Sequence, residues 1–218
     1  MSGWGDFCRG FAAGIAGGCV FLALLLLLFI AVDVRHIRSD LARKGPRAAA
    51  ASGNSCGVER AAVKHLTDGY RLGRVHRRTV AWLLAVKPPP VTQDSPRFSS
   101  WKPPEGQLEQ LTDVHVIAAK QENDSDLHVI VERGDYGSEL NVEAPAARCD
   151  STSPYAARLA AARAALETAL GPVSSRRYTP VDVRATVRGP LFYDVLHGQR
   201  GAPNGVELHP VTYFKAER

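Results

Sequence analysis

The hydrophobic and polar positions divide the chain into a long apolar run, a connecting segment and a region of shorter periodic elements. From Gly10 to Val32 there is no charged residue, and a helix of that length spans roughly the 30 Å of a bilayer core. The stretch after it is charged, then rich in Ala, Gly and Ser, and has no sustained apolar period. We therefore expect an N-terminal tail at 1–9, a transmembrane helix at 10–32 and a tether at 33–55.

Short segments of alternating character in the second half predict strands. Residues 113–120, 127–132 and 139–143 are β-branched with partial alternation, and polar turns separate them. Residues 181–187 alternate cleanly, and residues 205–214 are predicted to form a last strand. These patterns predict three strands early in the region and two late in it.

A helix is predicted between the third and fourth strands. Residues 156–170 are dense in Ala, Leu, Arg and Glu, and Gly171 followed by Pro172 marks the end. Ser153 is the expected N-cap, and Pro154 takes the first helical position.

The order β-β-β-α-β-β is the arrangement of the OB-fold barrel, whose closure removes exposed strand edges. The predicted fold is mainly β with one central helix, an OB-fold-like five-stranded barrel over residues 107–218. Residues 56–106, proline-rich in their second half, are predicted to be an N-terminal extension that wraps the barrel.

The distribution of charge along the chain bears on which binding partners are expected. The formal net charge is +5, but residues 1–104 carry +9 and residues 105–218 carry −4. The basic half adjoins the predicted membrane helix, so contact with anionic lipid headgroups explains it more simply than nucleic acid does. An acidic barrel repels a polyanion, which makes nucleic-acid binding unlikely. Gly10, Gly14 and Gly18 recur every fourth residue, a spacing that permits a helix-mediated dimer.

Two signals disagree on the orientation in the membrane. Five Lys and Arg residues follow the apolar run in residues 33–47 while only Arg9 precedes it, so the positive-inside rule places the domain in the cytoplasm. Cys56 and Cys149 are the only cysteines of the predicted soluble part, and an oxidising compartment would bridge such a pair. Two unpaired buried thiols are the alternative. A cleaved signal peptide, with processing near Ala48, is the rival to the membrane anchor.

The segment from Leu191 to Pro210 is unusually rich in titratable groups for a hairpin, and a second polar set precedes it. Because side chains two apart share a strand face, alternating residues of two strands form the candidate ligand set: Asp124, Asp126, His128, Glu207 and His209. If the faces converge, these groups suit a divalent transition ion such as zinc or manganese. The alternative is that the two aspartates turn a hairpin, while His197 and His209 donate hydrogen bonds to loop carbonyls.

Several enzyme classes are excluded by missing motifs. The sequence has no nucleophile elbow with a Ser-His-Asp order, no phosphate-binding loop and no dinucleotide fingerprint. A cysteine nucleophile is unattractive if Cys149 is bridged.

From Cys56 to its end the chain resembles a group of bacterial, mostly exported proteins of unassigned function. The matching motifs are Cys56-Gly-Val-Glu-Arg, Val63-Lys, Thr67-Asp, Asp124-Ser-Asp-Leu-His-Val-Ile, Cys149, Ser153-Pro-Tyr-Ala-Ala, His197-Gly-Gln and Ala202-Pro-Asn-Gly-Val-Glu-Leu-His-Pro-Val. The resemblance implies an exported OB-like domain with a Cys56–Cys149 disulfide, and so favours the outward orientation. Leu127 stands where the group usually has an aromatic residue, and Arg200 where it usually has Thr.

A more distant resemblance is to the staphylococcal-nuclease-like OB folds, which cleave phosphodiesters with calcium. Residues 123–126 and 142–146 are similar to the two segments that hold the metal in those enzymes. Ala146 replaces the expected general base, and Arg200 is the only positional candidate for a catalytic arginine. Little of the required electrostatic stabilisation is therefore left.

The sequence thus leads to two hypotheses. The first is a single-pass protein of the cell membrane, anchored by residues 10–32, whose extracytoplasmic OB-like domain is a non-enzymatic binding or interaction module without a cofactor. The second is a metal-dependent hydrolase of the nuclease or phosphodiesterase kind that uses the five candidate ligands, with His197 and Arg200 as catalytic residues.

Overall fold

A computed structural model of the protein describes residues 55–133, 138–196, 198 and 200–217. Its helices are α2 (Ala61–Lys64), α3 (Val80–Leu84) and α4 (Ala156–Leu170). Its strands are β1 (His76–Arg78), β2 (Leu108–Gln121), β3 (Leu127–Glu132), β4 (Leu140–Ala144), β5 (Thr179–Tyr193), β6 (Val206–Leu208) and β7 (Tyr213–Ala216).

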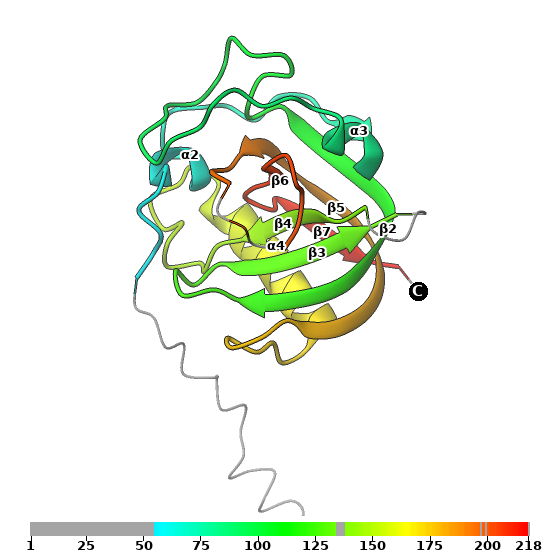
Figure 1. Cartoon of the computed structure of the whole chain (residues 1–218). Coiled ribbons are helices and arrows are strands. Elements are labelled where there is room, and N and C mark those ends of the chain that lie inside the picture. The colour runs from blue at the N-terminus through cyan, green and yellow to red at the C-terminus, as the bar shows by residue number, and fades with distance from the viewer. Residues whose placement is uncertain (1–54, 134–137, 197, 199, 218) are drawn as a thin grey trace, which may run out of the picture. The chain divides into compact units, whose positions relative to one another are not determined.

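Five of these strands close into a barrel (Figure 1). β2 pairs antiparallel with β3 and β5, β3 with β4, and β5 with β6, while β4 and β6 are parallel. The circuit β2-β3-β4-β6-β5-β2 is therefore complete. Outside this circuit, β1 pairs with residues 109–111 of β2, and β7 pairs with residues 185–188 of β5. The prediction of a mainly β fold is confirmed. α4 follows β4 and precedes β5, as predicted, but α2 and α3 are two further short helices.

The two longest strands bend to make this closure possible. β2 and β5 have 14 and 15 residues, and their pairing register shifts between Leu111 and Val114 and again between Val116 and Ala118. Asp113, inside the first irregularity, has a φ of 58°. Such bulges increase the local twist and bend of a strand, which barrels require.

Alternating side chains separate a barrel interior from an outer face. The inward residues of β3 and β4 belong to one apolar core, which also includes Ala162, Leu166 and Leu170 of α4. Successive side chains of a strand point to opposite faces. His128 and Glu143, whose neighbours along the chain are core residues, therefore lie on the outer face.

α4 covers the barrel and contributes one buried arginine. Arg163 donates hydrogen bonds to the carbonyls of Ala144 and Ser125, and to the side chain of Gln121 at 2.8 Å. The arginine therefore ties the helix to the end of β4 and to the turn between β2 and β3. This turn carries two of the candidate ligands.

Two local predictions are wrong. The N-cap of α4 is Tyr155, and Ser153 lies in the turn before it, where its hydroxyl accepts the Tyr155 backbone N–H at 3.3 Å. The predicted last strand, 205–214, is two strands, because the chain turns away at Pro210, which has no N–H for a ladder.

The predicted tail, the transmembrane helix at 10–32 and nearly all of the tether lie outside the described residues. Within the part that is described, no helix combines the length and apolar character needed to cross a bilayer.

A buried ion pair fastens the segment before the barrel to the end of β5. The guanidinium of Arg60 donates to both oxygens of Glu105, at 2.7 and 2.6 Å, and neither side chain is exposed. Arg60 also donates to the Tyr193 carbonyl, and Glu105 accepts the backbone N–H groups of Phe98 and Tyr193 at 3.0 Å each. A buried pair needs such additional bonds to offset its desolvation.

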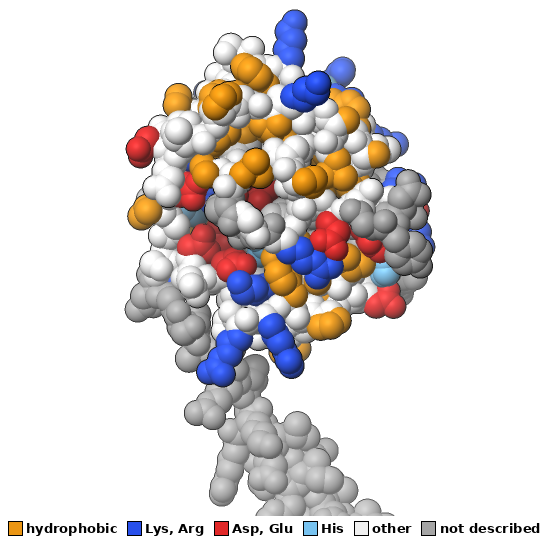
Figure 2. Space-filling model, in the orientation of Figure 1, with side chains coloured by type: hydrophobic (Ala, Val, Ile, Leu, Met, Phe, Trp, Pro, Cys, Tyr) orange, Lys and Arg blue, Asp and Glu red, His pale blue; other side chains and the backbone are white. Residues whose placement is uncertain are grey.

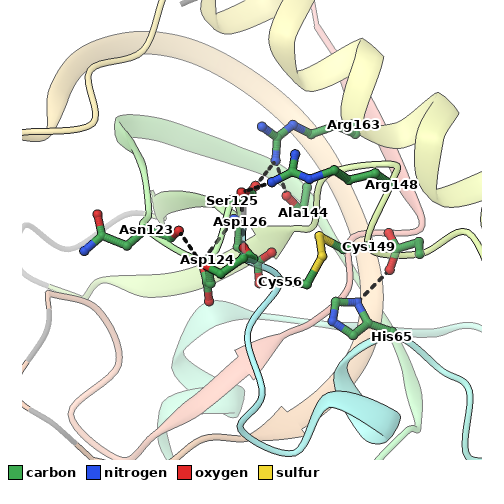
Figure 3. The surroundings of a disulfide bond; sticks show 12 residues. Cys56, His65, Asn123, Asp124, Ser125, Asp126, Ala144, Arg148, Cys149 and Arg163 are labelled. Carbon is green, nitrogen blue, oxygen red and sulfur yellow. Dashed lines mark hydrogen bonds and ion pairs between the residues drawn. A yellow bond between two sulfur atoms is a disulfide. The ribbon is translucent and has the colours of Figure 1, made fainter. Parts of the chain in front are cut away.

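The Cys56–Cys149 disulfide provides a second attachment (Figure 3). Cys56 precedes α2, and Cys149 lies between β4 and α4. The two are 93 residues apart in the sequence, and restricting an unfolded loop of that length stabilises a protein by about 4–5 kcal/mol. The predicted disulfide is confirmed. Next to it, His65 Nδ1 lies 2.8 Å from Asp150 Oδ1.

We expect Glu109 to lower stability as the pH rises from about 4.5 to about 7. Burial raises the pKa of this β2 carboxyl to about 7, although Arg78, 3.3 Å away, lowers it. In this pH window the unfolded chain releases the proton more readily than the folded chain, so unfolding is favoured by an amount on the order of 2 kcal/mol. Urea unfolding of the wild type and Glu109→Gln at about pH 4.5 and about pH 8 measures this effect. Between the lower and the higher pH, the free energy of unfolding of Glu109→Gln should increase by that amount relative to that of the wild type. If the difference between the two proteins is the same at both pH values, the expectation is contradicted.

Candidate functional site

A group of ionisable side chains is buried on the outer face of the barrel where β3, β4 and β6 adjoin. We call it the histidine–carboxylate cluster, and its members are Asp126, His128, Glu143, Glu207 and His209. His128 is paired with Glu143 across β3 and β4, and Asn141 with Glu207 across β4 and β6. Strand register therefore sets these side chains side by side.

Glu143 is the centre of the cluster. One of its carboxylate oxygens lies 2.7 Å from His128 Nδ1, and the other lies 3.0 Å from His209 Nδ1. Backbone contacts bring His209 to this position, because its N–H donates to the Pro190 carbonyl and the next N–H, that of Val211, donates to the Glu143 carbonyl at 2.7 Å. One buried carboxylate thus lies between two buried imidazoles.

Two further carboxylates approach His209. Asp126 Oδ2 lies 3.6 Å from its Nε2, and Glu207 Oε2 lies 3.9 Å from its Nδ1. The other oxygen of Glu207 accepts a hydrogen bond from Asn141 Nδ2 at 2.9 Å. Both distances to His209 are too long for hydrogen bonds. Glu207 Oε2 and His209 Nε2 are buried without a hydrogen-bond partner among the described residues.

The pKa values follow from burial and these charges. Burial alone would lower the pKa of both histidines, but Glu143 raises that of His128 to about 9 and, with Glu207, that of His209 to about 10. For Glu143 the two effects are reversed. Burial alone would raise its pKa, but the two histidines hold that pKa well below its usual range. Burial raises the pKa of Asp126 to about 7, with His209 opposing it.

The cluster is covered by α2 and by the segment between β5 and β6. Burial alone would lower the pKa of Lys64 in α2, but the carboxylates of Glu143, Asp194 and Glu207 raise it above its ordinary value. The Lys64 ammonium lies 5.6 Å from the centre of the Phe192 ring, and that ring lies 5.4 Å from the His209 ring.

The β5–β6 segment comes close to the cluster through its backbone. The Arg200 carbonyl lies 3.1 Å from His128 Nε2. Gly201 has a φ of 137°, and a Cβ there would lie 1.5 Å from Asn141 Oδ1. Glycine is therefore required at this position for the segment to reach the strand.

The structure brings four of the five predicted ligands together and leaves one aside. Asp124 lies in the turn before β3, where its Oδ1 accepts the backbone N–H of Asp126 at 3.1 Å (Figure 3). This matches the hairpin alternative for Asp124. Asp126 instead reaches the cluster.

The two residues proposed for catalysis do not join the cluster by their side chains. The Arg200 guanidinium pairs with both oxygens of Glu139 and lies 5.4 Å from the Tyr178 ring centre. His197 lies outside the described residues. Of Arg200, only the backbone carbonyl contacts a cluster side chain.

Sequence reasoning missed Glu143, Asn141 and Lys64. A signal for the first two was present, because Glu139-Leu-Asn-Val-Glu143 alternates polar and apolar residues and so predicts a polar strand face. Lys64 gave no such signal. Its position follows from the attachment of α2 to the barrel.

The arrangement has the chemistry of a cation site. Three carboxylates and an imidazole converge, and one ligand atom each from Asp126, Glu143 and His209 lie within 4.8 Å of one another. Mixed oxygen and nitrogen donors suit divalent transition ions better than Ca²⁺, which prefers oxygen alone.

In comparisons with known proteins, no protein-family model, curated protein or solved structure matches this chain.

We predict that Glu143→Gln lowers the pKa of both cluster histidines in the metal-free protein. Without the carboxylate charge, burial is the dominant effect, so the pKa of His128 should fall from about 9 to below its ordinary 6.5. Heteronuclear NMR of the imidazole nitrogens across a pH titration measures this. A pKa of His128 that stays near its wild-type value would show that Glu143 is not the charge that holds it.

Proposed function

We propose that this chain is a binding module built on an OB-like barrel, and that the histidine–carboxylate cluster is its ligand site. The support for the fold is the circuit β2-β3-β4-β6-β5 with α4 between β4 and β5, which corresponds to the strand order of OB barrels. Such barrels bind ligands on the face of their second and third strands, between the first and last hairpin loops. Here these strands are β3 and β4, and the loops are 122–126 and 194–205.

The observation that carries the proposal is the position of the cluster on this face. His128 belongs to β3, Glu143 to β4, Asp126 to the first of the two loops, and Glu207 and His209 adjoin the second. Burying so many ionisable groups costs free energy unless partners or a ligand satisfy them. The face is therefore better suited to a ligand than to packing alone.

Burial limits the size of the ligand. Lys64 and Phe192 are 7% and 1% exposed, and His209 is 1% exposed, so an ion or a small polar group fits where a polymer strand does not. On the face seen in Figure 2, Lys and Arg side chains are interspersed with Asp and Glu side chains. A polyanion binds preferentially to a continuous basic stripe. The mixed charges on this face therefore do not favour a polyanion as the ligand.

Binding without hydrolysis is favoured by the state of Arg200. A phosphodiesterase stabilises the charge of the reacting phosphate with positioned cations. The Arg200 guanidinium is instead paired with Glu139, and Ala146 has no base to offer. We therefore infer that the cluster holds its ligand and does not activate water for phosphodiester cleavage.

This proposal predicts no cluster-dependent phosphodiesterase activity. The full chain should release p-nitrophenol from bis(p-nitrophenyl) phosphate no faster than Glu143→Gln, in the presence of Ca²⁺, Mn²⁺ or Zn²⁺ in turn. Single-stranded DNA serves as the second substrate. Metal-dependent turnover in the wild type that is lost in Glu143→Gln would establish the hydrolase hypothesis in its place.

We further propose that residues 10–32 anchor the module and that it lies outside the cytoplasm. The apolar run of the sequence supports the anchor. The Cys56–Cys149 disulfide supports the outward side against the distribution of positive charges, because disulfides persist in oxidising compartments.

Labelling of Cys56 and Cys149 tests this orientation. In cells expressing the full chain with Cys8→Ser and Cys19→Ser, a membrane-impermeant maleimide should label the membrane fraction only after mild reduction of intact cells. A matched chain that also carries Cys56→Ser and Cys149→Ser is the control for background labelling. Labelling that requires lysis of the cells would place the domain in the cytoplasm.

A further inference from the structure

The atoms around His209 indicate the kind of ligand that the cluster binds. Three carboxylate oxygens surround the His209 ring: Glu143 Oε2 at 3.0 Å, Asp126 Oδ2 at 3.6 Å and Glu207 Oε2 at 3.9 Å. All four residues are at least nine-tenths buried. Three carboxylate oxygens this close together repel one another in a medium of low dielectric constant unless a positive charge lies among them.

The carboxylate oxygens that face away from His209 are held by neighbours. Glu143 Oε1 lies 2.7 Å from His128 Nδ1, and Glu207 Oε1 accepts from Asn141 at 2.9 Å. Each of these glutamates therefore presents one fixed oxygen to a neighbour and one oxygen toward His209. Ligands oriented by a second set of polar groups in this way are a feature of protein metal sites.

Unpaired polar atoms form a second, independent observation. Asp126 Oδ1, Glu207 Oε2 and His209 Nε2 are buried and have no hydrogen-bond partner among the described residues. The 3.6 Å between His209 Nε2 and Asp126 Oδ2 is too long for a hydrogen bond but suits two ligands that each lie about 2.0–2.2 Å from one ion.

We propose that Asp126, Glu143 and His209 bind one divalent first-row transition ion. This inference rests on the proposed function, since it names the ligand of that same site. Two carboxylate charges are offset by a dication, and the imidazole provides the nitrogen donor that distinguishes the site from a calcium site. His128 does not bind the ion. It positions Glu143 by holding one carboxylate oxygen, while its other nitrogen faces the Arg200 carbonyl at 3.1 Å.

The test is zinc binding by the full chain in detergent after treatment with a chelator. Isothermal titration with Zn²⁺ and elemental analysis after dialysis should both give about one ion per chain. Asp126→Asn keeps the size of the side chain and should abolish retention of the ion through dialysis. His128→Gln should weaken binding by about 10–100-fold, the usual effect of losing a residue that orients a metal ligand.

Asp124→Asn is the matched control. It alters a carboxylate two residues away in the same turn, and it should bind zinc like the wild type. Circular dichroism of each metal-free variant verifies that it is folded. Thermal unfolding gives a second readout, since zinc should raise the Tm of the wild type and of Asp124→Asn but not that of Asp126→Asn.

The outcomes separate this inference from the proposed function. A folded wild type that binds no zinc, or an Asp126→Asn variant that binds it undiminished, overturns the metal assignment and leaves a binding module for another small ligand. Stoichiometric zinc together with zinc-dependent phosphodiester turnover keeps the metal site and overturns the non-enzymatic function.

Discussion

The burial of Glu143 between His128 and His209 is the interaction on which the rest of the site depends. Burying a carboxylate without a partner of opposite charge would cost too much free energy on a covered barrel face. Burying two charged imidazoles without a carboxylate would do the same. Placed 2.7 and 3.0 Å apart, they compensate one another. This compensation permits α2 and the β5–β6 segment to close over β3, β4 and β6.

The cover is held by interactions that lie away from the cluster. Arg60 and Glu105 attach the segment before the barrel to the end of β5, and the Cys56–Cys149 disulfide attaches it to the loop after β4. α2 directly follows Cys56 and Arg60 in the sequence, so both attachments hold it in place and bring Lys64 to the cluster. The outer face of β3, β4 and β6 is thereby covered, and the cluster is buried beneath the cover.

Such enclosure affects function as well as stability. A low-dielectric environment strengthens every charge interaction within it, so a bound cation would be held strongly and would exchange slowly. The disulfide and the Arg60–Glu105 pair would then control access to the site, because α2 cannot leave the barrel freely while both remain.

Much of the architecture could be predicted from local patterns. Alternation in residues 127–132 and 181–187 gave the strands, and the composition of residues 156–170 gave α4 with its correct bounds. The break at Pro210 was missed because residues 205–214 were interpreted as one strand, and a local pattern does not reveal where a chain changes its pairing partner. Ser153 was misplaced as N-cap because a serine before a helix also fits the preceding turn.

The site was predictable only in part. The alternation of Asp126 with His128, and of Glu207 with His209, identified two polar strand faces, and the same argument applied to residues 139–143 would have added Asn141 and Glu143. The sequence by itself thus determined the alternating faces, the helix and the pair of cysteines, since these depend on neighbours along the chain. Only the tertiary structure decided that Glu143 stands between two histidines, that Asp124 stays aside and that Lys64 closes the site. Those outcomes depend on barrel closure and strand register, which join residues far apart in the sequence.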